Sequence, residues 1–468
     1  MIVVLQSLWL LVVILVFSMQ NQVLVISKNL ICNYDDLRGL AGFMNGLESS
    51  IDGWWPSNPS CCNWVGITCN SSSGRIVRLE LPSKRLTGNL SNSLANLDQL
   101  RTLNLSHNSL KGSLPVSLFH LPHLEVVDLS AHSNNLSGVL PPSLSNSPSI
   151  SSINLRNNSL DGLSNVNCSL MVNLTSLDLG TNNFSGTLPA NLASCRKLKT
   201  LNVAKNKLLT GQIPEKQLPS DYDLRFKELK ALVIANCRLT GSIPLWLNGL
   251  TRLQLLDLSW NDLTGTIPAY LGDFKSLFYL DISNNSLSGE IPKNLTQLQS
   301  LLSREISFVE PAPDFPFFRN INITSRGSTL QYNQIMRFPP LIDLSSNLLT
   351  GPILPEFGNL KRLHVLCLKQ NNLSGTIPSS LSGMIPSGGQ LSTFTNSSFE
   401  GNPGLCGELL VKCQVNRDSL QTPTSEDDEF YILRLLVFTG FGTGFLVPVI
   451  SMLVVPHGLR KMFYGSAR

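Results

Sequence analysis

Residues 100–123, LRTLNLSHNSLKGSLPVSLFHLPH, decide the fold, because the same pattern returns when the chain is shifted by 24 positions. Most of the spacings between copies are 24 residues, with one of 26, one of 31 and one of 62. A fixed period of this length indicates a stacked repeat protein. The last apolar position of the L-x-x-L-x-L segment recurs at Leu81, Leu105, Leu129, Leu155, Leu179, Val203, Ile234, Leu258, Ile282, Leu344 and Leu368.

The pattern L-x-x-L-x-L-x-x-N-x-L-x-G-x-I-P is that of a leucine-rich repeat in the form typical of plant extracellular proteins. Its alternating leucines predict a short strand that buries two side chains and turns their neighbours onto a concave face. Glycines such as Gly112 and Gly241 permit the tight backbone that follows. We expect an α/β, right-handed solenoid of about eleven 24-residue repeats. A ladder of buried amides is predicted at Asn108, Asn158, Asn182, Asn206, Asn261, Asn285, Asn347 and Asn371.

Cysteines cluster at the two ends of the array, as expected for caps held by disulfide bonds in an oxidising compartment. Cys168 and Cys195 lie in adjacent repeats, which allows a bridge between them. Cys237 and Cys367 are five or so repeats apart and cannot reach each other, and Cys237 takes the ladder position of an asparagine. The predicted cap pairs are Cys32 with Cys61, Cys62 with Cys69, and Cys406 with Cys413.

Two uncharged runs indicate a single-pass membrane protein. The apolar start reads as a secretory signal, and residues 435–455 are long enough to cross a bilayer. Acidic residues before that run and basic residues after it place the array outside the cell. The expected organisation is signal peptide 1–24, N-terminal cap 30–75, repeats 76–300, island insert 301–338, repeats 339–385, C-terminal cap 386–415, acidic linker 416–430, transmembrane helix 431–456 and cytoplasmic tail 457–468.

An extracellular chain predicts N-glycosylation at its Asn-x-Ser/Thr sequons. The expected sites are Asn70, Asn89, Asn104, Asn135, Asn157, Asn167, Asn173, Asn183, Asn284, Asn294, Asn322, Asn372 and Asn396.

Composition and motifs argue against several function classes. The 35 basic and 31 acidic residues are spread along the chain, so no basic face indicates nucleic-acid binding. His120 and His123 form an HxxH pair without a nearby third ligand, and no metal or other cofactor is expected. The "GFGTGF" run lies in the membrane span, outside the strand and helix context of a dinucleotide site. Hydrolase and kinase signatures are missing, so we expect no enzyme.

The two long spacings mark insertions. The 31-residue interval holds "KQLPSDYDLRF", which reads as a longer convex loop. The 62-residue interval contains "EPAPDFPFFRNINITSRGSTLQYNQ", which has no L-x-x-L-x-L segment but is rich in aromatic residues. A disordered linker would be poor in aromatics. We therefore expect this island to fold against the solenoid and to contact a ligand.

At this point the chain resembles the phytosulfokine receptors, plant leucine-rich-repeat receptor kinases that bind a small tyrosine-sulfated peptide. The segments "CCNWVGITCN", "LVIANCRLTGSIP", "LQLLDLSWNDLTGTIP", "EPAPDFPFF" and "IPSGGQLSTFTNSSFEGNPGLCG" carry the resemblance, which covers roughly residues 30–413. It implies that a peptide lies between the island and the concave face and pairs with the island as an added strand. The implied ligand contacts are Arg156, Asn202, Asn236, Asp257, Phe317 and Arg319.

The sequence departs from that family in three ways. The intracellular kinase is expected to be absent. Fewer repeats separate "LNVAKN" from "LVIANC", and "SSLSGMIPSGGQ" runs from mid-repeat into the C-terminal cap. These departures put in question both the length of the binding arc and the region that recruits a co-receptor kinase in the family.

Three hypotheses follow. The first is a plasma-membrane receptor-like protein that binds a small sulfated peptide and either signals through a partner kinase or sequesters the ligand. The second is a defence-type receptor or wall-enzyme inhibitor that grips a folded microbial protein. The third is a truncated relic with impaired folding, which secretion and glycan maturation would test.

Overall fold

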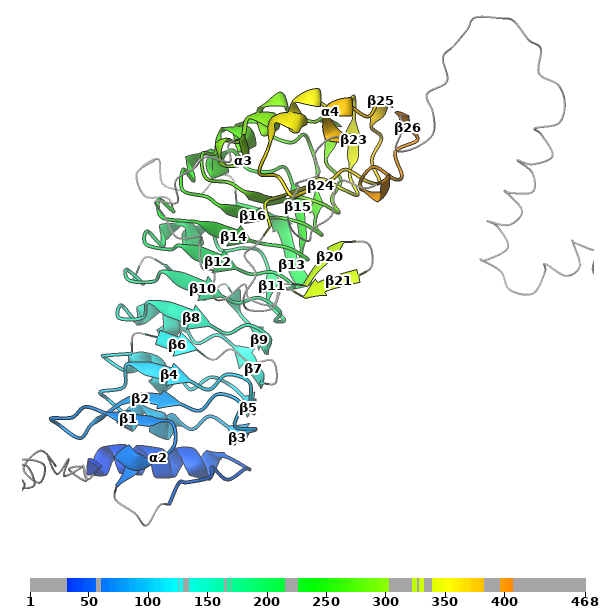
Figure 1. Ribbon diagram of the computed structural model, residues 1–468. Coiled ribbons are helices and arrows are strands. Elements are labelled where there is room, and N and C mark those ends of the chain that lie inside the picture. The colour runs from blue at the N-terminus through cyan, green and yellow to red at the C-terminus, as the bar shows by residue number, and fades with distance from the viewer. Residues whose placement is uncertain are drawn as a thin grey trace, which may run out of the picture. The chain divides into compact units, whose positions relative to one another are not determined.

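The computed structural model describes residues 32–55, 60–124, 126–128, 134–163, 166–168, 170–214, 226–302, 322–325, 328–331, 339–382 and 396–406. Its central element is a twelve-stranded sheet whose strands are stacked one above another along the repeats (Figure 1). The strands are β1 (Ile67–Cys69), β2 (Ile76–Glu80), β4 (Thr102–Asn104), β6 (Val126–Asp128), β8 (Ser152–Asn154), β10 (Ser176–Asp178), β12 (Thr200–Asn202), β14 (Ala231–Val233), β16 (Leu255–Asp257), β18 (Tyr279–Asp281), β22 (Leu341–Asp343) and β24 (Val365–Cys367).

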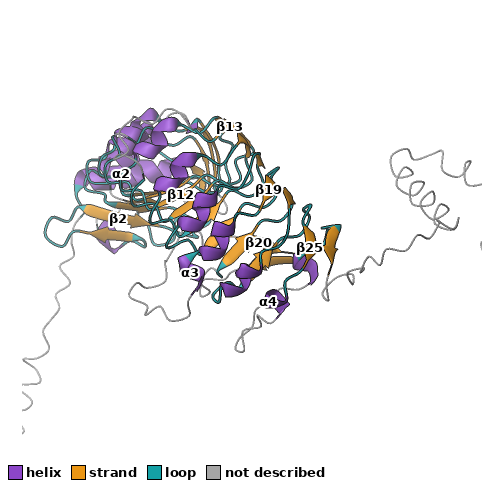
Figure 2. Ribbon diagram, turned by 90° about the horizontal axis from the view of Figure 1, so that it is seen from above, coloured by secondary structure: helices purple, strands orange, loops and turns teal. Residues whose placement is uncertain are grey.

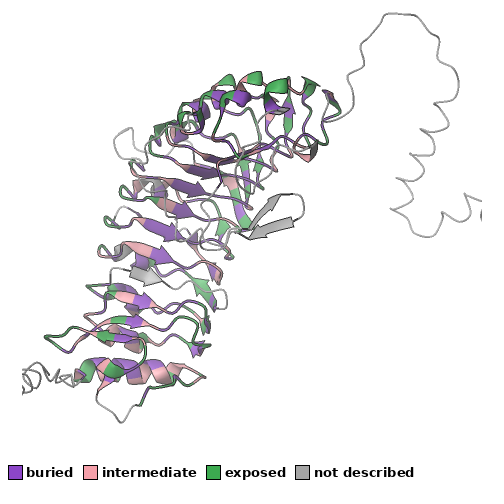
Figure 3. Cartoon of the chain, viewed as in Figure 1, coloured by how far each residue is buried: buried purple, intermediate pink, exposed green. Residues whose placement is uncertain are grey.

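The leucine period sets the register of this sheet. From β2 onward each strand pairs in parallel with the next, and β1 is antiparallel to β2. Leu177 of β10 pairs with Leu201 of β12, for example, and both side chains are buried in the core. Figure 3 shows buried residues along the strands of the stack whose burial is described. The leucine-rich-repeat solenoid expected from the sequence is confirmed.

Buried asparagines form the predicted ladder. Asn182 donates from Nδ2 to the carbonyl oxygens of Leu155 and Leu179, at 2.9 and 3.0 Å, and accepts from the amide of Leu160 at 3.0 Å. Each such amide therefore satisfies backbone groups of two repeats at once. The sequence analysis missed two members of the ladder. Asn134 and Asn402, both buried, make the same kind of bonds.

Cys237 occupies the ladder position between Asn206 and Asn261, as the sequence predicted. Its thiol lies 3.6 Å from the carbonyl oxygens of Val203 and Ala235. Burial raises its pKa to about 11, so the thiol is a structural group and not a reactive thiolate.

Short parallel strands form further sheets beside the main one. The glycines that follow the ladder lie in these strands with a left-handed backbone, as at Gly112 (φ +79°) and Gly241 (φ +82°). The sequence pattern predicted a tight backbone at these glycines but not these additional strands. These strands are β3 (Thr87–Asn89), β5 (Ser109–Gly112), β7 (Asn135–Val139), β9 (Ser159–Asp161), β11 (Ser185–Gly186), β13 (Leu208–Gln212), β15 (Arg238–Gly241), β17 (Asp262–Leu263), β19 (Ser288–Glu290), β23 (Leu348–Thr350), β25 (Ser374–Thr376) and β26 (Gly404–Cys406).

Short helices gather along one side of the stack (Figure 2). Most are single 3₁₀ turns that follow a proline. They are η1 (Cys61–Asn63), η2 (Asn92–Asn96), η3 (Val116–His120), η4 (Pro142–Asn146), η6 (Ala190–Ser194), η8 (Leu245–Gly249), η9 (Ala269–Asp273), η10 (Lys293–Gln297), η12 (Pro355–Asn359) and η13 (Asn396–Ser398), with α3 (Gln299–Leu302) and α4 (Ser379–Ser382).

Helix α2 (Tyr34–Gly46) caps the N-terminal end. Its Asp36 is fully buried and accepts two-pronged bonds from the Arg75 guanidinium, together with the amide of Ile76 at 2.8 Å. Arg75 also pairs with Asp98. This network ties the helix to the first repeat strand.

The predicted disulfide bonds are present within the described residues. Cys32–Cys61, Cys62–Cys69 and Cys168–Cys195 are bonded, with Cα separations of 5.3, 5.5 and 4.8 Å. Cys406 is also disulfide-bonded, and its predicted partner Cys413 lies outside the described residues. Cys237 and Cys367 are free and buried, as expected.

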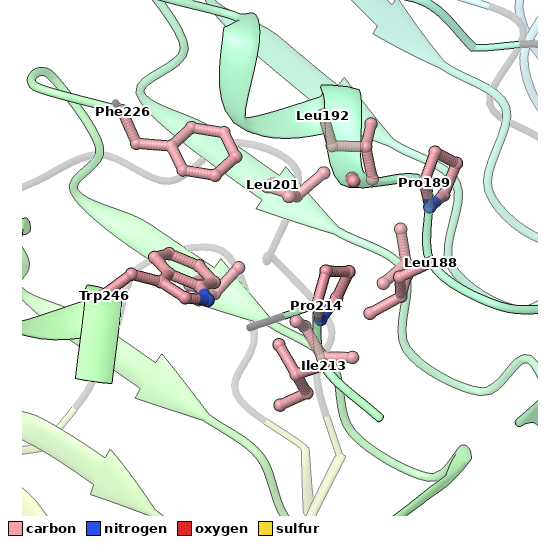
Figure 4. Close-up of a pocket in the computed structure, with 12 residues that line it drawn as sticks. Leu188, Pro189, Leu192, Leu201, Ile213, Pro214, Phe226 and Trp246 are labelled. Atoms are coloured by element: carbon pink, nitrogen blue, oxygen red, sulfur yellow. The ribbon is translucent and has the colours of Figure 1, made fainter. Parts of the chain in front are cut away.

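The 31-residue interval is accommodated without a break in the sheet, because Thr200 pairs directly with Ala231. Behind it lies an apolar cavity of about 40 Å³. In Figure 4 the rings of Phe226 and Trp246 line one side of the cavity, and Leu188 lines the other. Residues 215–225, which include most of the extra segment, lie outside the described residues.

The 62-residue interval is also bridged, because Leu280 of β18 pairs with Ile342 of β22. The main sheet therefore continues past the insert. Within the insert, β20 (Asn322–Ser325) and β21 (Ser328–Gln331) form an antiparallel hairpin. The rest of residues 303–338 lies outside the described residues.

The predicted signal peptide 1–24, transmembrane helix 431–456 and tail 457–468 all lie outside the described residues. Among the helices of the described ranges, none has the length and apolar character needed to cross a bilayer.

Candidate functional site

The candidate site is the outer face of the twelve-stranded sheet, which we call the concave face. Side chains that alternate with the buried leucines project from it at the ends of the strands. The implied contacts follow this face, with Arg156 just after β8, Asn202 at the end of β12 and Asp257 at the end of β16. Asn236 lies three residues beyond β14, at the rim of the face.

Lys205, a basic residue that was not predicted from the sequence as part of the site, interacts electrostatically with Arg156 and Asp257. Partial burial lowers the pKa of Lys205, and the nearby positive charge of Arg156 lowers it further. Asp257 opposes this effect, and Lys207 adds to it. Lys205 therefore belongs, with Arg156 and Lys207, to a group of basic side chains at the rim of the concave face, and the positive charges of the other two repel it. Such a group favours an anion, whose charge would relieve that repulsion.

Asn202 is buried, with 3% of its surface exposed. Its Nδ2 donates to Asp178 at 2.9 Å, and its Oδ1 accepts from the amide of Ala204 at 2.9 Å. Its carboxamide is therefore already bonded within the sheet face. We expect Asn202 to position its neighbours more than to contact a ligand directly.

Asn236 lies at a left-handed position with a φ of +53°. It lines a groove of about 500 Å³, which also includes Lys207, Arg238, Trp260 and Asn284. The groove has both charged and aromatic walls.

Three carboxyl groups stand in register near the insert. Asp257, Asp281 and Asp343 lie on neighbouring strands, and each Oδ1 accepts from the amide and hydroxyl of the serine two residues later. Burial raises the pKa of Asp257 to about 6, although the bonds from Ser259 oppose that effect. Burial also raises the pKa of Asp281 well above the ordinary range, and the charges of its two neighbours add to this.

An apolar cluster occupies the same region of the face, separate from the leucine core. It includes Ala231, Val233, Leu255, Tyr279 and Leu341, all at least 97% buried. Tyr279 and Leu341 are direct partners at the point where the chain leaves and rejoins the sheet. The face of the two strands that flank the insert is therefore apolar, with the carboxyl row beside it.

Phe317 and Arg319, the two implied contacts in the island, lie outside the described residues. Most of the sequons lie where an attached glycan could extend into solvent. Exposed side chains are found at Asn70, Asn89, Asn135, Asn167, Asn173, Asn183 and Asn372, partly buried ones at Asn104, Asn157, Asn284 and Asn294, and those of Asn322 and Asn396 are not described.

Within the described ranges, one group of potential metal ligands stands close enough together to hold an ion, namely Cys61, Cys62 and Cys69. All three are disulfide-bonded. Their sulfurs are therefore unavailable as thiolate ligands.

Comparisons with known proteins agree with the repeat fold described above. Leucine-rich-repeat models match residues 99–121, 173–195, 227–287, 341–360 and 362–384, and a leucine-rich-repeat N-terminal domain model matches residues 33–70. Phytosulfokine receptor 1 of Arabidopsis thaliana is 36% identical over 91% of this chain and 64% of that receptor. Over most of its length the chain is therefore similar to a plant leucine-rich-repeat receptor. The resemblance to phytosulfokine receptors is thereby confirmed.

Two further proteins are similar to this chain. Phytosulfokine receptor 2 of Arabidopsis thaliana is 44% identical over 40% of the chain and 22% of that receptor. The structure of the Arabidopsis receptor kinase HAESA, solved with the peptide hormone IDA and the co-receptor SERK1, is 28% identical. It has a TM-score of 0.57 and covers 81% of this chain and 62% of HAESA.

The chain spans 64% of the length of phytosulfokine receptor 1 and 22% of receptor 2. The alignment with receptor 1 runs over 656 positions, although the chain has 468 residues. Receptor 1 therefore contains segments within the matched region that have no counterpart here. This agrees with the shortened array expected from the sequence.

Proposed function

We propose that this protein is a cell-surface receptor-like protein whose concave face binds a small secreted peptide. We further propose that the peptide is tyrosine-sulfated, like phytosulfokine. The repeat array is the extracellular part. Three disulfide bonds and the many sequons support this location. The chain either passes the signal to a partner kinase, with a co-receptor as a second partner, or holds the peptide away from other receptors.

The observation that carries the proposal is the group of Arg156, Lys205 and Lys207 on the concave face. Lys205 is partly desolvated and lies in the field of Arg156. A sulfate ester keeps its negative charge, so it would pair with these cations and relieve their mutual repulsion. The two phytosulfokine receptors among the relatives favour a sulfated peptide over other anions.

The part of the concave face next to the insert fits the rest of a short peptide. The buried apolar cluster, which includes Val233 and Tyr279, supports this part of the face from below. Asp257 offers a carboxyl group beside them. An extended peptide placed here would gain affinity from backbone hydrogen bonds and selectivity from its side chains.

The direct experiment is calorimetric titration of the purified full-length chain in detergent with disulfated phytosulfokine and with the same peptide lacking sulfate. The proposal expects measurable binding of the sulfated peptide and weaker binding of the other by tenfold or more, because charge-assisted hydrogen bonds contribute about 1.5–3 kcal/mol. Equal affinity for both peptides would show that the sulfate groups are not recognised. If neither peptide binds, the proposal that this protein is a phytosulfokine-like peptide receptor is wrong.

The alternative is recognition of a folded microbial protein by the concave face. It predicts affinity that survives the double substitution Phe317→Ala and Arg319→Ala. The peptide proposal predicts that the same substitution abolishes binding, because both residues belong to the island.

A further inference from the structure

The groove beside Asn236, which we call the rim groove, contains a complete glycosylation sequon. Asn284, Asn285 and Ser286 all line it, and Trp260 forms part of the same wall. Asn284 is partly buried, and its Nδ2 lies 3.3 Å from the hydroxyl of Ser283. A glycan attached at this nitrogen would begin inside the groove.

Trp260 and Asn284 occupy equivalent positions in consecutive repeats. The amide of Trp260 donates to the carbonyl oxygen of Ser283 at 2.9 Å, and that of Asn261 donates to Asn284 at 3.2 Å. Trp260 has a φ of +55° and Asn284 a φ of +52°, so their side chains leave neighbouring turns in the same direction. Both residues line the same groove, so the indole and the sequon side chain share one space.

The exposure of Trp260 needs an explanation. Its side chain is 54% exposed, and a bulky residue with positive φ is uncommon. Among the described residues, the equivalent positions of other repeats hold polar side chains, namely those of His107, Asn157, Thr181, Lys205, Asn236, Asn284, Ser346 and Gln370. Core packing does not require an aromatic ring at this position.

The groove has the size and chemistry for sugar. Its volume of about 500 Å³ exceeds that of one water molecule, about 30 Å³, by more than an order of magnitude. Its lining includes Asn236, Arg238 and Asp262, which offer donors and acceptors for hydroxyl groups. An aromatic face beside such groups suits the apolar C–H face of a pyranose ring.

We propose that Asn284 carries an N-glycan whose first N-acetylglucosamine packs on the face of Trp260, so that the protein's own carbohydrate occupies the part of the groove next to Asn284. The seated glycan covers the exposed indole and joins two repeats at the rim of the concave face. This inference does not depend on the identity of the peptide ligand.

The test uses full-length protein made in plant cells treated with a mannosidase inhibitor, so that its glycans are oligomannose. Endoglycosidase H then cleaves the native protein between the two core N-acetylglucosamines. Release at each site is followed by glycopeptide mass spectrometry. Asn157 is the internal control, because its sequon asparagine has the same left-handed backbone, with a φ of +58°, and lies several repeats away from Trp260.

Trp260→Ala is expected to speed release at Asn284 by about fivefold, the factor that corresponds to an aromatic contact of about 1 kcal/mol. Release at Asn157 should be unchanged, and Trp260→Phe should keep most of the protection. An unmodified Asn284, an unchanged rate in Trp260→Ala, or an equal acceleration at both sites would overturn the proposal.

A thermal-stability cycle gives an independent readout. Ser286→Ala removes the sequon and leaves Asn284 in place, and the Ser286 side chain is exposed. The proposal expects Trp260→Ala to lower Tm in the glycosylated protein and to have a smaller effect in the Ser286→Ala background. Equal effects in both backgrounds would show that the glycan and Trp260 are not coupled.

Discussion

Asp257 in β16 is paired in register with Asp281 in β18, so a buried and a partly buried carboxyl group stand on adjacent strands of the concave face. Asp343 extends the row across the insert. Like charges at strand spacing disfavour ionisation, and burial adds to that effect. The row therefore makes the stability of the protein depend on pH.

Asp257→Asn tests this dependence. The folded state raises the pKa of Asp257 from 3.8 to about 6, so the folded protein binds the proton more tightly and loses stability as pH rises through that window. At about pH 7 the substitution should raise the free energy of unfolding by roughly 2 kcal/mol, and at about pH 4 the gain should vanish. Urea unfolding at both pH values measures the difference. The exposed Asp262→Asn is the control, and a gain of the same size at both pH values would contradict the assignment.

Asn261→Ala should destabilise the array by about 2–4 kcal/mol, because buried backbone groups would lose their partners. Asn261 donates to Ile234, Leu258 and Ser259 at 2.7–3.2 Å. The neighbouring exposed Asp262→Ala should cost less than about 0.5 kcal/mol. Chemical unfolding compares the two variants, and similar midpoints would argue against a stabilising ladder.

Asp36→Asn should weaken the N-terminal cap by about 3 kcal/mol, because the Arg75 guanidinium loses its buried carboxylate and keeps only the half-exposed Asp98 as an ion-pair partner. Asp35 is exposed and adjacent, so Asp35→Asn is the matched control. Hydrogen exchange of α2 amides would report the change. Unchanged protection in Asp36→Asn would show that the cap does not rely on this ion pair.

Replacing both Cys168 and Cys195 with alanine should lower the free energy of unfolding by about 2–4 kcal/mol, the usual effect of losing a bond that closes a loop of this length. Thermal unfolding of the double variant measures the loss. A Tm equal to that of the parent protein would mean that the bridge does not stabilise the fold.

The repeat geometry could be predicted from sequence because its signals are local. The leucine spacing fixes which side chains of β10 and β12 are buried. Asn182 lies three residues after the last leucine of its repeat, and this fixed position in the sequence predicts its place in the ladder. Asn134 was missed because the spacing of 26 shifts it out of the 24-residue frame. The side sheets were missed because segments such as Ser185–Gly186 are too short to show alternation.

The candidate site was less predictable than the fold. Asn202 looked like a ligand contact, but it bonds to Asp178 in the adjacent repeat, and this partner is identified only when the strands are placed side by side. Lys205 gave no sequence signal because an isolated lysine at a turn is ordinary. Its altered pKa comes from burial and from Arg156, two repeats earlier.

The most direct test of the account compares Lys205→Met with Lys197→Met in calorimetric titrations of the full-length chain with sulfated and unsulfated phytosulfokine. Lys197 is exposed and lies in the turn after η6, so its loss changes net charge equally without altering the concave face. We predict that Lys205→Met weakens binding of the sulfated peptide about tenfold or more and leaves the unsulfated peptide unaffected. Equal effects of the two substitutions on the sulfated peptide, or no effect of either, would contradict the proposal that this basic group recognises sulfate.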